Sequence, residues 1–562
     1  MKNIKYFIPI IALLLSSCDD YLDVNQNPNQ VLYSDLFLKE LLPAAQTNPF
    51  RIQVNNMNDI GNIFSNSFAG NSLTFGGVNN TEYQLTLDSS FRPAIFEGMF
   101  RAVANLDAII VKSGTKPKNA YFKAVAIITK AHYMQTLVDL YGDVPYTQAF
   151  LGADNTTPAY NDDQFIYRSL ITSLEQARTI IDLADTTVAE DITVPDVMFH
   201  GVMNNWIEFA NTLELRMLLR MSNNTGSVAA YRNSKILALA NYINGVGGVN
   251  PSGSSFLTSD VKINPGYNNS AALTINPLYS YFGFTNTTAT NQNRTLLCPS
   301  GHIYRALRLS TTYPTADPST VVSSTSIFPT LNYANVNDLR YNRIFSGTLP
   351  QRAITQGVSG VDMFVPGGVT GQPGRLGLGL INPYNQSLAL SVAELSANDG
   401  YVMNLSEVYF LKCEAGINTD FAPLGLSSTA QSNFDAGINS SFTMLGATGA
   451  ATYVTAINLK PFYGLAASTT PVQKLHAVMY QKWVSQVGFN GIQTYIDLTR
   501  TGFPITPLSN VTQRPTKPKR LYYPNSETIS NTANLPSITD ADLFTITSKS
   551  VFWLQGDPAL GN

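Results

Sequence analysis

The sequence predicts a helical scaffold interrupted by a long loop-rich region. The helical period dominates residues 96–181, and helices are predicted again within 401–497, at 401–416 and 475–497. Between them, residues 224–399 are rich in Gly, Pro, Ser, Thr and Asn and show little helical periodicity. Because ordered proteins seldom keep long loops without function, we expect this region to carry a binding surface.

The first stretch contains two well-defined helices. Residues 120–141 are apolar on most sides, which predicts a buried helix that ends at Gly142. In the next helix, Asn161 and Gln164 form a predicted capping pair. One face of that helix carries the apolar residues Ile166, Leu170, Leu174, Ala177 and Ile181.

A third helix follows, with an apolar stripe from Trp206 to Met221. Arg216 and Arg220 lie one turn apart near its C-terminal end, where the helix dipole favours positive charge. Helices are predicted again at 401–416, 475–488 and 489–497.

The amino terminus has the features of an export signal. Lys2 and Lys5 precede an apolar run at 6–15, which is too short to span a bilayer, since spanning takes about 20 residues. The run leads into LSSC at 15–18, which resembles the lipobox of bacterial lipoproteins. We therefore expect residues 1–17 to be a signal peptide and Cys18 to be lipidated; a secretory signal with a chance cysteine is the alternative.

Composition and motifs exclude several classes of function. The net charge is -3 and basic residues do not cluster, which argues against a nucleic-acid partner. The four histidines lack metal-ligand spacing, and no nucleophile elbow or phosphate-binding loop is present. We expect no catalytic residue, metal or cofactor, although a structural calcium remains open. A glycoside hydrolase is the enzyme alternative, because it needs only two carboxylates across a cleft.

Cys298 and Cys413 are the only other cysteines. Two thiols of this kind are usually free and buried, and this is the prediction. An oxidising envelope compartment leaves a disulfide between them as the alternative.

Several segments resemble the SusD/RagB family of nutrient-binding outer-membrane lipoproteins, and its second SusD-like subgroup in particular. They are CDDYLD at 18–23 with NPN at 27–29, LYGDVPY at 140–146, Trp206 with NTLELR at 211–216, YFLKCEA at 409–415, and QKW at 481–483. Together they bracket nearly the whole chain after the signal.

The resemblance implies an all-α fold of tetratricopeptide-like helix pairs with a large loop-rich ligand-binding region. Residues 18–30 would be a lipidated tether and 31–562 a single SusD-like domain. Its helical scaffold would comprise about 31–223 and 400–500, and its loop-rich lobe about 224–399. The segment 141–146 would be a structural turn and Arg216 a packing residue. The resemblance also implies a surface-exposed position on the outer membrane, a SusC-like TonB-dependent transporter as partner, and a glycan as ligand.

The resemblance transfers no ligand residue, because the family's ligand contacts lie in variable loops. Aromatic rings stack on sugar faces, and amide or guanidinium groups bond to hydroxyls. On that chemistry the candidates are Asn71, Phe75 and Tyr83 in the loop at 66–91, and Tyr267, Tyr279, Tyr281 and Arg294 in the lobe. Neither loop contains tryptophan, so a peptide or another small nutrient remains an alternative ligand.

Overall fold

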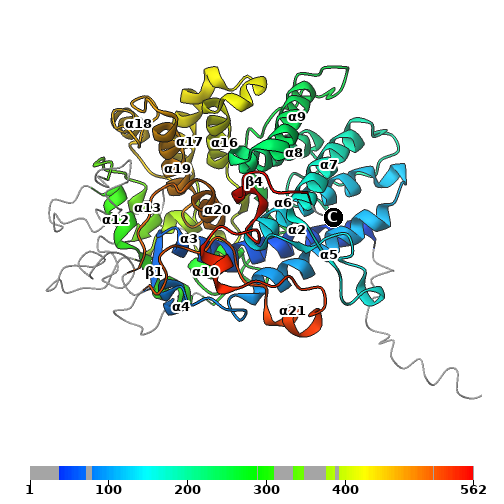
Figure 1. Cartoon of the computed structure of the whole chain (residues 1–562), viewed down its shortest axis with the longest axis horizontal. Coiled ribbons are helices and arrows are strands. Elements are labelled where there is room, and N and C mark those ends of the chain that lie inside the picture. Colours follow the sequence, from blue (N-terminus) through cyan, green and yellow to red (C-terminus); the bar gives the residue numbers. More distant parts are fainter. Residues whose placement is uncertain are drawn as a thin grey trace, which may run out of the picture.

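The computed structural model describes residues 37–70, 79–287, 289–308, 333–346, 375–385, 391–509 and 512–560. It confirms the all-α fold, because helices pack on helices throughout (Figure 1). Within the described residues, strands form only two-stranded antiparallel ladders. These pair β1 (Phe68–Gly70) with β5 (Leu297–Pro299), β2 (Val144–Pro145) with β3 (Tyr160–Asn161), β4 (Val261–Ile263) with β8 (Gly400–Met403), and β6 (Phe345–Ser346) with β7 (Arg375–Leu376).

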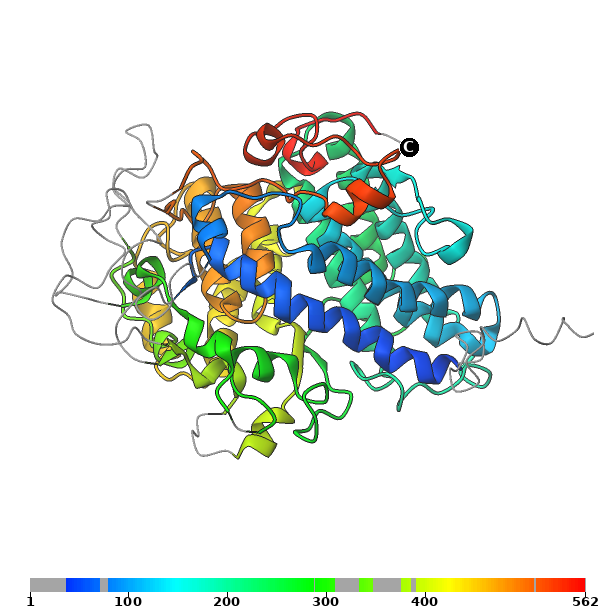
Figure 2. The ribbon, with the colours of Figure 1, turned by 90° about the horizontal axis from the view of Figure 1, so that it is seen from below.

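One long helical rod crosses the molecule (Figure 2). It consists of α2 (Leu38–Ile52), a π-helical turn (Gln53–Met57) and α3 (Asn58–Phe64), which follow one another directly. The first part of the rod packs on α5 and α6, and its last part packs on α20. The rod therefore connects the two groups of helices described next.

The end of the rod is locked to α20 at a contact that only glycine permits. A Cβ atom on Gly61 would lie 2.2 Å from the backbone of Gly491, so neither helix tolerates a larger residue without moving. Beside this contact, Asn58 Nδ2 donates to the Gly488 carbonyl at 2.7 Å, and the Gly491 amide donates to Asn58 Oδ1 at 2.8 Å. These bonds fix where the rod ends.

The first group of helices forms the predicted helix pairs. It comprises α5 (Phe96–Ser113), α6 (Ala120–Tyr141), α7 (Asp163–Asp182), α8 (Met203–Arg220) and α9 (Gly226–Ile243). Each helix packs on the next one along the chain. The helix predicted at 120–141 is confirmed, both in its bounds and in its burial.

Two details of this group differ from prediction. The cap of α7 is Asp162, whose carboxylate accepts the Phe165 amide at 2.9 Å, and not Asn161. Asn161 instead accepts the amide of Thr147 at 2.8 Å and closes the β2–β3 turn. In addition, α9 is a regular helix, so the loop-rich region begins after Ile243 and not at 224.

The second group comprises α16 (Leu405–Ile417), α17 (Ala430–Leu445), α18 (Ala450–Ile457), α19 (Pro471–Gln486) and α20 (Gly491–Thr501). The helix predicted at 401–416 begins at Leu405, because the preceding residues form β8. Between the two groups, the described part of the lobe contains short helices: α10 (Pro277–Phe282), α11 (Gln292–Leu296), α12 (Gly301–Leu307), α13 (Tyr341–Ile344), α14 (Leu378–Ile381) and α15 (Val392–Ser396).

A network of buried charges joins both groups. Arg220 of α8 pairs with Asp139 of α6 at 3.4 Å and with Asp497 of α20. Asp497 also contacts Lys482 of α19 at 2.8 Å and Arg500 at 3.4 Å. All five side chains are at most 3% exposed.

The network continues along α8. Arg216 donates to Gln135 of α6 at 2.9 Å and pairs with Glu407 of α16 at 3.4 Å. Arg178 of α7 pairs with Glu214 of α8 at 2.6 Å. Arg216 is fully buried, which confirms its prediction as a packing residue.

These contacts set the protonation of the central carboxylate. Burial alone would raise the pKa of Asp497, but Arg220, Lys482 and Arg500 lower it below its ordinary value. Asp497 therefore remains charged at neutral pH and balances three cations.

Two further predictions concern the cysteines and the membrane. Cys298 and Cys413 are both buried and form no disulfide with each other, so the disulfide alternative is wrong. Across the described residues, no helix combines the length and apolar character needed to cross a bilayer.

We predict that Arg220→Met lowers the free energy of unfolding by about 3–5 kcal/mol, because it leaves Asp139 and Asp497 buried beside fewer cations. The matched control is Arg514→Met, which breaks a half-exposed pair with Asp540 and should cost less than about 1 kcal/mol. Urea unfolding of both variants measures the difference. Equal losses would contradict a structural role for the network.

Candidate functional site

The rod ends in a tight turn, and this turn forms one side of the candidate ligand site. After Phe64, Asn66 adopts a left-handed conformation with φ 57°, and β1 then pairs with β5 of the lobe. Ser67 Oγ accepts the indole N–H of Trp483 at 2.7 Å, and Ser300 Oγ donates to the Asn66 carbonyl. The turn is thus fixed both by the scaffold and by the lobe.

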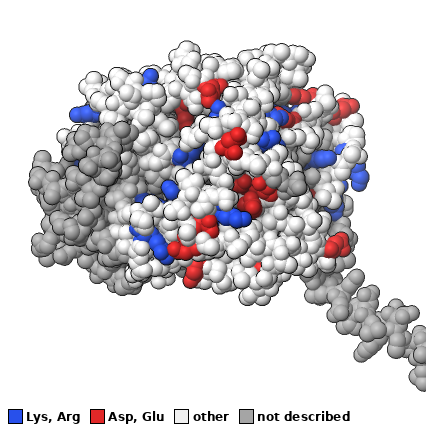
Figure 3. All heavy atoms as spheres, viewed as in Figure 1, with Lys and Arg blue, Asp and Glu red and all other residues white. Residues whose placement is uncertain are grey.

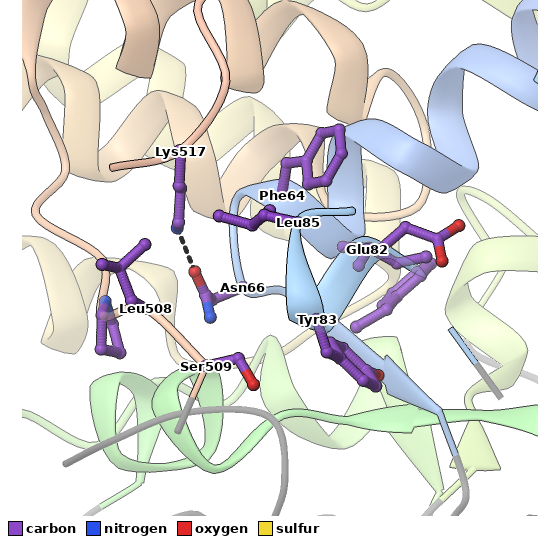
Figure 4. Close-up of a pocket in the computed structure, with 11 residues that line it drawn as sticks. Phe64, Asn66, Glu82, Tyr83, Leu85, Leu508, Ser509 and Lys517 are labelled. Carbon is purple, nitrogen blue, oxygen red and sulfur yellow. Dashed lines mark hydrogen bonds between the residues drawn. The ribbon is translucent and has the colours of Figure 1, made fainter. Parts of the chain in front are cut away.

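A pocket opens between this turn and the segment that follows α20 (Figure 4). One wall is formed by Phe64, Asn66, Tyr83 and neighbouring residues, and the other by 507–509 with Lys517. The cavity measures about 20 Å³, which is room for little more than one water molecule. In the described residues, this pocket can therefore accept a single polar group and not a whole sugar ring.

Lys517 is the basic residue of this pocket, and Glu82 is its acidic residue. Its Nζ donates to Asn66 Oδ1 and to Thr506 Oγ1, as Figure 4 shows for Asn66. Within the described part of the chain, no carboxylate lies within ion-pair distance of Lys517. Burial and the nearby Lys519 lower its pKa well below the usual range. Lys517 is thus a hydrogen-bonding amine with no counter-ion of its own among these residues.

A histidine lies behind the turn. The His302 ring is 5.3 Å from the Trp483 ring, and its Nδ1 is 3.1 Å from the Tyr333 hydroxyl. Burial, with Lys517 and Arg305 nearby, lowers the pKa of His302 to about 3. His302 is therefore neutral at physiological pH and supports the turn as a packed ring.

An acidic cluster lies beside the pocket. Arg92 pairs with Asp59 at 2.9 Å and with Glu82 at 2.7 Å, and the Tyr281 hydroxyl bonds to Asp59. Burial raises the pKa of Asp59, although Arg92 partly opposes that shift. The cluster holds α4 (Asn80–Gln84) and α10 against the rod.

The structure brings together some of the predicted ligand residues. Tyr83 lines the pocket, but its ring is 4% exposed and its hydroxyl accepts the Gly70 amide. Tyr281 meets the same acidic cluster from the lobe side. The hydroxyl groups of both residues are therefore already bonded within the protein.

The other candidates lie elsewhere. The Tyr279 ring is 6.0 Å from the Phe284 ring, and the Arg294 guanidinium lies 5.2 Å from the Phe284 ring. Tyr267 is buried, 5% exposed, and its amide donates to Asn264 at 2.9 Å. Asn71 and Phe75 lie outside the described residues. A ligand contact by any of the seven stays a prediction.

Sequence reasoning missed the contribution of the chain after α20. Lys517 and 507–509 complete the pocket, although they lie more than 400 positions from Asn66. The only signal in the sequence was the Pro-rich character of this tail, and composition does not say which residues it meets.

Three carboxylates near the predicted turn at 141–146 form a compact group. The acceptor atoms of Asp143, Asp162 and Asp163 lie within 4.8 Å of one another. Each accepts a backbone amide: Asp143 that of Asp163 at 3.1 Å, Asp162 that of Phe165 at 2.9 Å, and Asp163 that of Phe552 at 2.7 Å. The group therefore has a structural role in joining α7 to the C-terminal segment, as expected for the turn.

The described part of the face in Figure 3 is mixed in charge. On the face in Figure 3, basic and acidic side chains of the described residues alternate among uncharged ones. Such a surface suits an uncharged ligand better than a polyanion.

Together, the two groups of packed helices and the loops that meet at the end of the rod define the class of fold: an all-helical scaffold that carries a loop-rich lobe. The family is identified by comparison. The SusD-like family model described as "Starch-binding associating with outer membrane" matches residues 30–247 and 330–524. The chain belongs to this family.

Solved structures show the same fold. A chitin-binding SusD homolog from Flavobacterium johnsoniae is 19% identical, with a TM-score of 0.61, over 88% of this chain and 94% of that one. A SusD homolog from Parabacteroides distasonis is 16% identical, with a TM-score of 0.64, over 92% and 98%. No curated protein sequence matches the chain.

We predict that His302→Gln reduces the loss of unfolding free energy that occurs as the pH is lowered. Unfolded histidine titrates near 6.5, whereas folded His302 has a pKa of about 3, so only the unfolded state gains this proton between these values. Stability is therefore lost as pH falls below 6.5, by up to about 1.4 kcal/mol per pH unit. Urea unfolding at pH 7 and 4.5 should show a smaller loss for the variant. Parallel profiles would contradict the assignment.

Proposed function

We propose that this protein captures a glycan at the outer-membrane surface and delivers it to a SusC-like TonB-dependent transporter. The observation that carries the proposal is the family match, which spans both helical groups and whose description names starch binding at the outer membrane. The similar fold of a chitin-binding homolog supports a glycan as the ligand class.

The pocket beside the rod is the proposed ligand-contact region. Lys517 and Asn66 present hydrogen-bonding groups that can hold one hydroxyl or amide group of a sugar. The rest of the sugar would lie outside this small cavity. The proposal assigns no cofactor, metal or catalytic residue to the site.

Attachment through Cys18 is the second element of the proposal. Acyl chains on this cysteine would hold the protein at the membrane, since stable anchoring takes more than one chain. Delivery to a transporter in the same membrane requires such an anchor.

We predict saturable glycan binding without turnover. The soluble form lacking residues 1–18 would be titrated calorimetrically with maltohexaose and hexa-N-acetylchitohexaose, and each mixture assayed for products. Lys517→Gln should weaken binding about tenfold or more, the effect of losing one hydrogen bond from a charged group. The exposed Lys116→Gln is the matched control. Product formation would instead support the hydrolase alternative.

We predict that Cys18→Ala moves the full-length protein from the membrane fraction to the soluble fraction. Ser17→Ala is the matched control, because this substitution keeps a small residue before the cysteine. The Ser17→Ala protein should remain in the membrane fraction. Fractionation followed by immunoblotting measures both. Membrane association of Cys18→Ala equal to the control would overturn the anchor.

A further inference from the structure

A larger groove lies in the first helical group, away from the pocket at Lys517. It is bounded by α5, the chain after β2, and α21 (Asn525–Ser530), and it encloses about 450 Å³. Figures 1 and 2 both show α5 and α21 side by side. The two sites share no lining residue, and this volume is within the range of small-molecule sites. We call it the α5–α21 groove.

The floor of the groove is aromatic. The rings of Phe96 and Phe100 are 4.7 Å apart, and those of Phe100 and Phe150 are 5.8 Å apart. Phe96 is buried, while Phe100 and Phe150 are partly exposed. The floor therefore offers carbon surface to a ligand.

Phe150 is held in place against a backbone preference. Its φ is 66°, a left-handed conformation that bulky residues rarely adopt. The Lys130 ammonium lies 4.9 Å from its ring centroid, and Asp107 holds that ammonium at 2.6 Å. Because the ring is positioned before any ligand arrives, binding does not have to order it.

The rim of the groove carries both signs of charge. Glu97 and Arg101, one turn apart on α5, make no hydrogen bond or ion pair within the described residues. Glu527 of α21 accepts from the Tyr160 hydroxyl at 2.7 Å and from Asn531 at 3.3 Å, both through Oε2. Its Oε1 therefore remains available, as a fixed acceptor.

We propose that the α5–α21 groove is a second saccharide-binding site. A neutral sugar ring matches this arrangement: its C–H face stacks on Phe100 and Phe150, its hydroxyls donate to Glu97 and Glu527, and its oxygens accept from Arg101. A charged ligand of either sign would leave part of the mixed rim unsatisfied. The site would add a second point of attachment to a glycan chain, independently of the pocket at Lys517.

The test is ligand-observed NMR on the soluble form with maltohexaose and hexa-N-acetylchitohexaose, in the wild type and in Phe100→Ala, Phe150→Gly and Glu97→Gln. Phe150→Gly removes the ring and suits the backbone angle, so folding should be preserved. Each of these variants should lower the affinity of the groove for at least one of the two sugars about tenfold, while the other site is unaffected. Phe37→Ala and Glu190→Gln, both far more exposed, are the matched controls.

Two results would overturn the inference. In one, the groove variants bind both sugars as the wild type does while Lys517→Gln alone reduces binding; the proposed function would then stand without a second site. In the other, the substitutions in the groove leave the affinity for both sugars unchanged, even if they weaken association with a transporter. Thermal unfolding of each variant separates a lost site from a lost fold.

Discussion

The scaffold depends on buried arginines whose charge partners lie on other helices. Arg216 and Arg220 leave the same face of α8, and their partners come from α6, α16 and α20. A buried charge without a partner costs several kcal/mol. Any sliding or rotation of one helix against another would separate these charges, so the network fixes the register and orientation of the helices as well as their spacing. The network thereby fixes the position of α20, and α20 in turn fixes the end of the rod through Gly491.

Periodicity allowed the regular part of the fold to be predicted from the sequence. Helix α6 was recovered at both ends because it is apolar on most sides and stops at a glycine. Helix α9 was missed because Gly226 and several Ser and Asn residues make its composition resemble the lobe, while its buried face is narrow. The cap of α7 was displaced by one residue, because Asn161 and Asp162 are both good caps and only the β2–β3 pairing decides between them.

The candidate site was far less predictable. Tyrosines were chosen because their rings could stack on a sugar, but Tyr83 and Tyr267 fill the core, where a large ring gains most from burial. Lys517 and Asn66 meet only after the whole chain has folded, and no local pattern encodes that meeting. Such sites arise from loops that a rigid scaffold brings together, so their residues are separated in sequence by the scaffold itself.

The continuous rod has a mechanical consequence for the domain. Its three parts contain 15, 5 and 7 residues, which at the rise of a helix extends about 40 Å. The rod begins at the N-terminal end of the described chain and ends at the turn beside Lys517. Because it packs on both helical groups, a displacement at its first turn is transmitted to the pocket by the whole domain moving as one body.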